Sequence, residues 1–198
     1  MNWSIEGNIG AGKSTLGKAL HMKYPNTYNL IPEPVKVWMD TGMLQSYYSD
    51  KKRWAYTFQN FALVTRLISW RENKKLGMIN INDRSVFGDK EVFAKMLMDD
   101  GMMEPLEMAV YQEYHKLITD EDRPTLFIYL RTPVDTCVDR IHQRSRTSED
   151  GIPREYLQKV HDLHEDWMAR LPSDRVLVLD GTRPVAELVE QVHSYYFD

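Results

Sequence analysis

The sequence predicts an α/β protein built on a five-stranded parallel sheet with helices on both faces. Short apolar runs alternate with long amphipathic segments along the chain, the pattern of strand–helix–strand units. The run at residues 125–130, TLFIYL, is continuously apolar, which is typical of a parallel strand buried on both faces. A glycine-rich motif follows the first of these runs, where such sheets bind phosphate. A mixed α+β fold is the alternative that the pattern leaves open.

One domain is expected to span residues 1–198. The chain has the length of a single domain, and it contains no internal repeat and no linker rich in Pro, Gly or Ser. Pro105, Pro133 and Pro153 stand near three expected helix starts, where a missing N–H costs little. The expected strands are residues 3–5, 28–31, 78–82, 125–130 and 176–179. The expected helices are residues 15–23, 51–75, 85–98, 105–118, 134–143, 153–171 and 183–195.

Composition excludes several classes of protein. The 25 Lys and Arg against 29 Asp and Glu leave a net charge of −4, whereas proteins that bind nucleic acid usually carry a basic surplus. The lone Cys137 excludes an internal disulfide and favours a reducing compartment. No run approaches the roughly 18 apolar residues of a membrane span, and the N-terminus lacks the pattern of a signal peptide. We therefore expect a cytoplasmic protein with no nucleic-acid or membrane partner.

The glycine-rich segment at residues 7–14, GNIGAGKS, matches the phosphate-loop pattern GxxxxGK[ST]. Its glycines allow backbone amides to turn inward around phosphate oxygens, and Lys13 would reach the β- and γ-phosphates. The Ser14 hydroxyl would hold Mg²⁺, and the helix that follows adds its N-terminal dipole. The candidate phosphate-binding residues are Gly7, Asn8, Ile9, Gly10, Ala11, Gly12, Lys13, Ser14 and Thr15.

Two further strand ends carry charged residues that the fold would gather beside this loop. Glu33 precedes Pro34, which favours an extended backbone, and the pair Asp83-Arg84 follows the third expected strand. A hydroxyl that accepts a phosphoryl group needs a carboxylate to orient it and to accept its proton. Each charge alone is equally well read as a solvated acid or a local ion pair. Together they favour a phosphotransferase over a protein that merely binds nucleotide.

Three arginines form a third candidate group. Arg140 and Arg144 lie one helical turn apart, and Arg146 enters the polar segment that follows. Cations over a triphosphate can stabilise charge on the transferred group and exclude water. A solvated basic helix face is the alternative interpretation when these residues are taken alone.

Taken together, these segments resemble the deoxynucleoside kinases, a family that includes deoxycytidine, deoxyguanosine and mitochondrial-type thymidine kinases. The resemblance covers nearly the whole chain and rests on residues 5–15, 33–35 with Trp38, 54–55, 58–59, 83–85, 144–152, 156–157, 161, 164–165 and 167. It implies a P-loop kinase fold with a short Arg-rich lid at about 144–152. It also implies ATP-dependent phosphorylation of the 5′-hydroxyl of a deoxynucleoside, with ATP and Mg²⁺. A homodimer and feedback by a deoxynucleoside triphosphate are further expectations from the family.

The resemblance also implies roles for individual residues. Glu33 would act as the base at the 5′-hydroxyl, with Arg84 and Lys13 as its catalytic partners, and Asp83 would join Ser14 near Mg²⁺. Arg140, Arg144 and Arg146 match the lid arginines. Tyr48 and Glu149 would hold the 3′-hydroxyl, and Gln59 would hydrogen-bond the base between aromatic walls. The implied substrate-binding residues are Glu33, Trp38, Tyr48, Phe58, Gln59, Arg66, Arg84, Asp89, Phe93 and Glu149.

Two of these positions bear on the preferred base. The family's deoxycytidine and deoxyguanosine kinases hold Arg and Asp where this chain has Arg66 and Asp89, whereas thymidine-accepting members tend to have apolar or small residues. A buried Arg–Asp pair can bond the exocyclic groups of cytosine or a purine, and burying it is costly unless it is used. We therefore expect deoxycytidine or a purine deoxynucleoside as the substrate. A thymidine-preferring kinase and a purely structural salt bridge are the alternatives.

Other interpretations remain open. A nucleoside monophosphate kinase is also a small P-loop phosphotransferase, but its acceptor phosphate needs extra arginines in place of the carboxylate of Glu33. A non-catalytic nucleotide-binding module is less favoured, because residues 73–76, NKKL, fail the guanine-binding motif at the fourth position. We expect Trp54 and Trp167 to be core residues, and we do not expect His161 and His164 to form a metal site.

Overall fold

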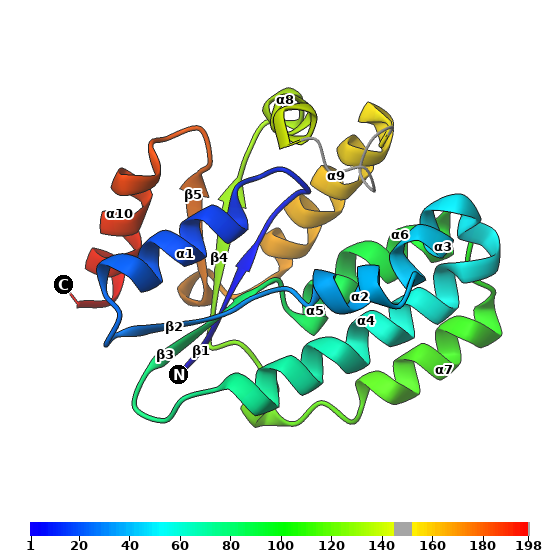
Figure 1. Cartoon of the computed structure of the whole chain (residues 1–198), viewed down its shortest axis with the longest axis horizontal. Helices are drawn as coiled ribbons and strands as arrows, with labels where there is room; N and C mark the ends of the chain where they lie inside the picture. Colours follow the sequence, from blue (N-terminus) through cyan, green and yellow to red (C-terminus); the bar gives the residue numbers. More distant parts are fainter. Residues whose placement is uncertain (145–151, 198) are drawn as a thin grey trace.

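The structure, a computed structural model, describes residues 1–144 and 152–197, apart from the side chain of Arg144. Its centre is one sheet of five parallel strands in the order β2-β3-β1-β4-β5 (Figure 1). The prediction of a five-stranded parallel sheet covered by helices is confirmed. The strands are β1 (Asn2–Glu6), β2 (Tyr28–Ile31), β3 (Ile79–Asp83), β4 (Leu126–Arg131) and β5 (Val176–Asp180).

The central position of β1 decides where ligands can bind. β1 pairs with β3 on one side and with β4 on the other. The chain therefore builds β2 and β3 on one side of β1 and then crosses to build β4 and β5 on the other side. In open α/β sheets the ligand crevice lies beyond the carboxyl ends of the strands at such a reversal. The phosphate loop is the segment that leaves β1 at this point.

Helices cover both faces of the sheet. On one face, α1 (Lys13–Lys23) packs beside α10 (Val185–Phe197), and their leucines and valines share a core with the sheet. On the other face, α9 (Arg154–Arg170) contributes Val160 and Trp167 to a core that includes Phe127 and Tyr129 of β4. The helix α8 (Val134–Arg144) lies beside α9. The strands β1 to β4 are therefore largely buried on both faces, whereas the edge strand β5 is only partly covered.

A layer of helices beside β2 and β3 has a core of its own (Figure 1). Tyr47, Phe58 and Tyr111 are among the side chains that this layer buries. Its helices are α2 (Val35–Asp40), α3 (Met43–Ser49), α4 (Lys51–Asn73) and α7 (Pro105–His115). The short helices α2 and α3 were not predicted, because six and seven residues after Pro34 and Gly42 are too few for a clear helical period.

The helix expected at residues 85–98 is not a single α-helix. It begins as α5 (Val86–Gly88), continues as a π-helical segment at Asp89–Ala94 and ends as α6 (Lys95–Asp99). A wider π turn is common at functional sites, and this one carries Asp89 and Phe93. Two 3₁₀ turns, at Asp120–Asp122 and Ser173–Arg175, complete the described elements.

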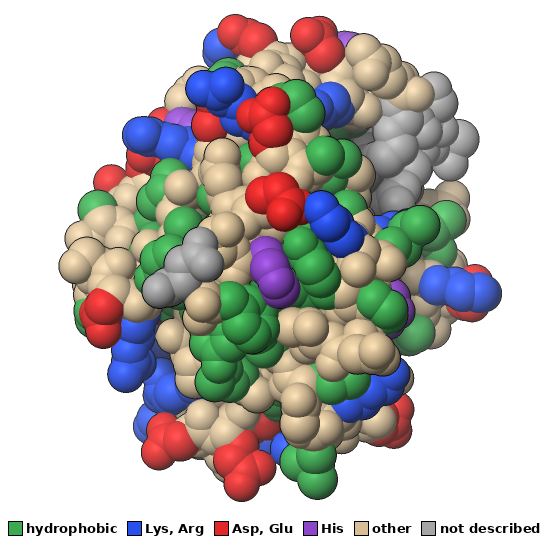
Figure 2. All heavy atoms as spheres, turned by 90° about the vertical axis from the view of Figure 1, so that its left-hand side faces the viewer, with side chains coloured by type: hydrophobic (Ala, Val, Ile, Leu, Met, Phe, Trp, Pro, Cys, Tyr) green, Lys and Arg blue, Asp and Glu red, His purple; other side chains and the backbone are tan. Residues whose placement is uncertain are grey.

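The described surface shows mixed charge on the side formed by α1 and α10. Figure 2 shows acidic and basic side chains interspersed on this face, with apolar side chains between them. Among the described helices, none is long and apolar enough to cross a membrane.

Candidate active site

The phosphate loop is held against β4 and α8 by its glycines. Gly7 and Gly10 have φ of 144° and 78°, a region that favours glycine. A Cβ atom on Gly7 would lie 2.7 Å from the Leu130 carbonyl oxygen, and one on Gly10 would lie 2.6 Å from that of Cys137. Any side chain at these positions would push the loop off its support, so the glycines allow this close packing.

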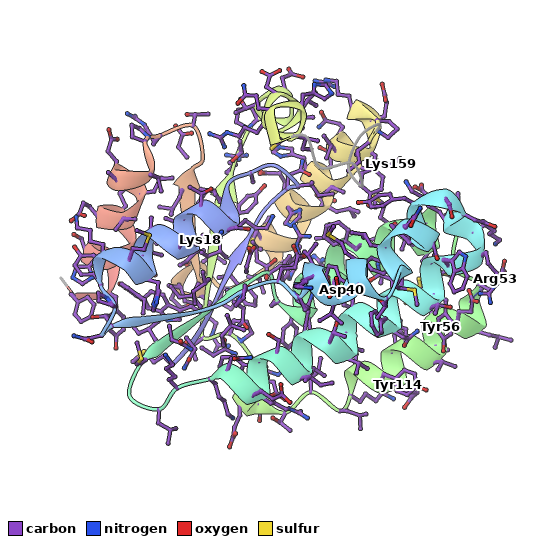
Figure 3. All side chains as sticks on the ribbon, viewed as in Figure 1. Lys18, Asp40, Arg53, Tyr56, Tyr114 and Lys159 are labelled. Carbon is purple, nitrogen blue, oxygen red and sulfur yellow. The ribbon has the colours of Figure 1, made fainter. Side chains whose placement is uncertain are left out.

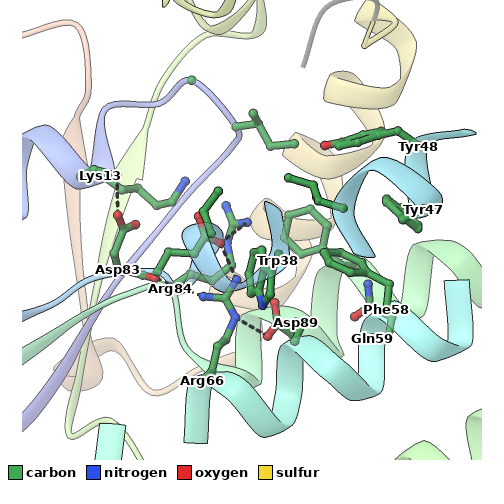
Figure 4. Close-up of a pocket in the computed structure, with 18 of the residues that line it drawn as sticks. Lys13, Trp38, Tyr47, Tyr48, Phe58, Gln59, Arg66, Asp83, Arg84 and Asp89 are labelled. Carbon is green, nitrogen blue, oxygen red and sulfur yellow. Dashed lines mark hydrogen bonds and ion pairs between the residues drawn. The ribbon is translucent and has the colours of Figure 1, made fainter. Parts of the chain in front are cut away.

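Lys13 points back into the loop (Figure 4). Its ammonium group donates hydrogen bonds to the carbonyl oxygens of Gly7, at 3.1 Å, and Asn8, at 2.8 Å. Burial and the nearby Arg84 lower the pKa of Lys13 to about 8. Beside it, the Ser14 hydroxyl donates a hydrogen bond to the Asp83 carboxylate at the end of β3. The loop and the third strand therefore meet as the sequence predicts.

Arg140 lies in α8 and is bonded to the loop. Its two amino groups donate to the carbonyl oxygens of Ala11, at 2.8 Å, and Gly181, at 3.0 Å. Arg140 therefore links α8 to the phosphate loop and to the residue after β5. Arg146 and Glu149 lie outside the described residues, as does the side chain of Arg144.

Glu33 is the centre of a buried charge network (Figure 4). One arm of Arg66 lies 2.5 Å from the Glu33 carboxylate, and its Nε lies 2.6 Å from the carboxylate of Asp89. Arg84 approaches Glu33 at 3.9 Å. Burial alone would raise the pKa of Glu33, but Arg66, Arg84 and Lys13 together hold it at about 2. Glu33 is therefore ionised near neutral pH, while burial raises the pKa of Asp89.

A cavity of about 140 Å³ joins this network to the phosphate loop. Trp38, Phe58 and Gln59 gather on its far side from Lys13 (Figure 4). The Trp38 and Phe58 rings meet edge to face, with centroids 5.3 Å apart. The buried Oε1 of Gln59 has no hydrogen-bond partner among the described residues. An unpaired amide oxygen between aromatic walls suits a flat polar ligand, because such a group is costly to bury without a partner.

A second cavity, of about 350 Å³, lies on the other side of the phosphate loop. It is lined by Leu16 and Leu188 on apolar walls and by Arg140 and Arg183 on a basic one. Gly10, Gly12 and Thr15 line both cavities. The phosphate loop is therefore the shared wall of two sites, one beside β2 and β3 and one beside β4 and β5.

Comparison with known proteins agrees with this arrangement. The sequence model of the deoxynucleoside kinase family matches residues 3–194. The chain belongs to the deoxynucleoside kinase family. It is therefore a phosphotransferase that phosphorylates deoxynucleosides, as predicted, and ATP is the donor that the family implies.

Several curated relatives of this kinase carry base-specific names. A fowlpox virus (strain NVSL) protein named "Probable deoxycytidine kinase" is 41% identical over 170 residues, which are 84% of this chain and 71% of that protein. Deoxycytidine kinase 2 of Gallus gallus is 34% identical over 193 residues, 83% of this chain and 72% of that protein. The mitochondrial deoxyguanosine kinase of Xenopus laevis is 32% identical over 193 residues, with coverage of 84% and 72%.

The kinase also places two tyrosines at the cavity that sequence reasoning missed. Tyr47 of α3 stacks on Phe58 with centroids 4.7 Å apart. Tyr156 of α9 lines the same cavity, and burial raises its pKa well above the ordinary value. The family resemblance includes Tyr156 only within the segment 156–157 and implies no role for it. Tyr47 is adjacent to Tyr48, and both line the cavity, but because α3 itself is not predicted, the sequence does not indicate that Tyr47 also reaches the site.

The remaining singled-out residues of the kinase lie away from the cavity. Trp167 is buried in the core beneath the sheet, whereas Trp54 is only partly buried against the helical layer. His164 is buried, and its Nδ1 lies 2.7 Å from the Val160 carbonyl oxygen, within hydrogen-bond distance. Within residues 1–144 and 152–197, no three His, Cys, Asp or Glu side chains converge to hold a metal ion.

Proposed function

We propose that the kinase binds its deoxynucleoside with the base between Trp38, Phe58 and Gln59 and with the 5′-hydroxyl at Glu33. The observation that carries this proposal is that Glu33 and Lys13 line one cavity, with Gln59 at its far side. A hydroxyl at Glu33 would then face a phosphoryl group held by the loop. Tyr48 lines the cavity at a place where it would reach the sugar.

In this arrangement the charges divide the work of the transfer. Glu33, with a pKa near 2, is a weak base, so its main effect is to orient the hydroxyl and to accept its proton as the bond to phosphorus forms. A loose transition state needs little deprotonation beforehand. Lys13 and Arg84 lie beside Glu33 and would stabilise negative charge on the transferred group.

We also propose Mg²⁺ as the companion of ATP. The donor set fits this ion, since Mg²⁺ in kinases takes one or two protein oxygens and completes its shell with phosphate and water. Ser14 and Asp83 would hold it, and the buried Oδ1 of Asp83 has no hydrogen-bond partner among the described residues. When bound, the ion would neutralise charge on the β- and γ-phosphates.

Substitution of Glu33 tests the proposed chemistry. Glu33→Gln keeps the shape of the side chain but removes the acceptor, so kcat should fall by about 10²–10⁴-fold with little change in ATP affinity. Labelled-ATP assays on four deoxynucleosides and their monophosphates measure the effect. Glu190→Gln, an exposed glutamate paired with Lys23, is the matched control. An unchanged kcat would remove the role of Glu33, and a preference for monophosphates would indicate a nucleoside monophosphate kinase.

For the base, we propose deoxycytidine or a purine deoxynucleoside. The support is the buried Arg66–Asp89 pair at the cavity, together with the names of the relatives. The pair offers both a donor and an acceptor to exocyclic groups, whereas the thymine methyl needs an apolar niche. Arg66 also pairs with Glu33, so its replacement affects catalysis with every base.

The ratio between two substrates separates these effects. The double variant Arg66→Met with Asp89→Ala should raise kcat/KM for thymidine relative to deoxycytidine by about 10-fold or more, even if both values fall. Arg71→Met, which breaks the Arg71–Asp122 pair outside the cavity, is the control and should leave the ratio unchanged. A ratio that does not move towards thymidine would show that the Arg66–Asp89 pair is only structural.

Further proposals concern partners and location. The donor nucleoside would occupy the second cavity beside Arg140 and Arg183. A deoxynucleoside triphosphate could fill the first cavity with its phosphates on the loop, which would provide feedback.

We propose a homodimer through α4 and α7, whose outer faces meet near Tyr56 and Tyr114 (Figure 3). The lone, buried Cys137 suits a cytoplasmic location.

A further inference from the structure

Arg84 is held in a backbone conformation that it would not adopt by itself. Its φ is 67°, and within the described residues no other non-glycine residue has a positive φ. L-residues with a side chain avoid this region, so the surrounding structure must impose it. The conformation turns the guanidinium inward, where it donates to the Gly7 carbonyl oxygen at 2.8 Å and lies 4.4 Å over the Phe93 ring.

Glu6 accepts hydrogen bonds from Ser85, the residue directly after Arg84. Glu6 ends β1, one residue before the phosphate loop, and is fully buried. Its Oε1 accepts hydrogen bonds from the backbone N–H of Ser85, at 2.9 Å, and from the Ser85 hydroxyl, at 2.6 Å. The Ser4 hydroxyl donates to the same oxygen at 2.6 Å. Three donors on one oxygen suit a carboxylate, whose oxygens are acceptors only.

The other side of Glu6 leaves no room for movement. Its Oε2 has no hydrogen-bond partner among the described residues and lies against Gly88, where a Cβ atom would be only 2.4 Å away. The Ser85 hydroxyl in turn accepts from the Gly88 N–H at 3.2 Å. One carboxylate therefore fixes the start of the phosphate loop, Ser85 and the first turn of α5 relative to one another.

We propose that Glu6 is a positioning residue for phosphoryl transfer, acting through Arg84. By holding Ser85 it keeps Arg84 in the left-handed conformation, with its guanidinium between the phosphate loop and Glu33. A buried carboxylate with an unpaired oxygen is an expensive way to cap a helix, which a serine alone can do. Its placement at the point where the loop meets the Asp83-Arg84-Ser85 turn explains why the cost is accepted. The inference rests on the proposed role of Arg84.

A double-mutant cycle tests this link. Glu6→Asp keeps the carboxyl group but shortens the side chain, so that it no longer reaches Ser85. It should lower kcat by about 10- to 100-fold, because small displacements of a catalytic group have effects of this size, and leave KM for both substrates within about threefold. Glu6→Gln, which keeps an acceptor at the position of Oε1, should recover most of the lost kcat. In an Arg84→Ala background, Glu6→Asp should change kcat by less than about twofold.

Controls separate positioning from stability. Glu165→Asp is the matched control: Glu165 accepts from Tyr129 and Arg131 outside the cavity, so its shortening should leave kcat unchanged. Thermal midpoints and ATP affinity are measured for every variant. If Glu6→Asp does not fold, Ser85→Ala takes its place in the cycle and should show the same dependence on Arg84.

The outcomes distinguish two failures. If Arg84→Ala retains full kcat, the proposed role of Arg84 is wrong. If Arg84→Ala lowers kcat but Glu6→Asp does not, or if the two effects multiply, Glu6 does not act through Arg84 and the positioning role is overturned.

Discussion

At the scale of single residues, the site is a set of charges that hold one another in place before any ligand arrives. Lys13 bonds to carbonyl oxygens of its own loop, and Arg66 bonds to the carboxylate proposed to receive the substrate hydroxyl. Burial and the nearby Arg84 lower the pKa of Lys13 to about 8, whereas Arg66, Arg84 and Lys13 together hold that of Glu33 at about 2. Near neutral pH the two groups therefore behave differently. Glu33 stays ionised, whereas Lys13 begins to lose its charge as the pH approaches 8.

The lowered pKa of Lys13 predicts a pH dependence of ATP binding. As pH rises through about 8, the fraction of free enzyme with a charged Lys13 falls, so KM for ATP should rise by about 10-fold per pH unit once above that pKa. At saturating ATP, kcat should change less, because the bound triphosphate favours the ammonium form. Initial rates between about pH 7 and 9.5 measure both quantities, with KM for the deoxynucleoside as the control. A KM for ATP that is flat across this range would contradict the lowered pKa.

Much of the site could be predicted because its motifs follow strand ends. The carboxyl ends of β1, β2 and β3 carry the phosphate loop, Glu33 and Asp83-Arg84, and parallel pairing places them at one edge. The contact between Arg66 and Glu33 could not be predicted in this way. It depends on how α4 is rotated against the sheet, which sequence spacing does not define.

At the scale of elements, the errors concentrate where local geometry departs from a regular period. The third and fourth strands begin and end one residue later than predicted, because backbone pairing rather than apolar character sets their ends. The segment at residues 86–99 reads as one helix, but its middle winds as a π-helix. This π-helical segment carries Asp89 and Phe93, which line the cavity, so an irregular element contributes to the site together with regular ones.

At the scale of the whole molecule, α4 and α7 carry several exposed apolar side chains within the described part of the chain. They project from neighbouring helices that pack on each other through their inner faces. Exposed apolar side chains on two neighbouring helices are typical of a subunit interface. The exposed apolar residues are Val64 and Ile68 of α4, Leu106, Val110 and Tyr114 of α7, and Leu117, which follows α7.

A pair of matched valines tests the proposed homodimer. Val64 on α4 is 48% exposed and Val178 on β5 is 53% exposed. Val64→Glu should convert the dimer to monomer, because it places a charge within the apolar face, whereas Val178→Glu should leave the dimer intact. Sedimentation velocity of the wild-type chain and both variants measures the outcome. A monomeric wild-type chain, or a dimer that survives Val64→Glu, would rule out this face as the interface.

Because the phosphate loop lies between two cavities, the residues that line one cavity are largely different from those that line the other. Apart from residues 9–16, which contribute to both, the first cavity is lined by residues between 33 and 93 and by Tyr156, and the second is lined by residues between 130 and 188. Substitutions around one cavity could therefore change the preferred nucleobase without altering how the phosphate donor binds. Substitutions around the other could change the preferred donor without altering the preferred nucleobase. Related chains should therefore vary independently at the two sets of lining residues, while Gly10 and Gly12, which line both cavities, should stay unchanged.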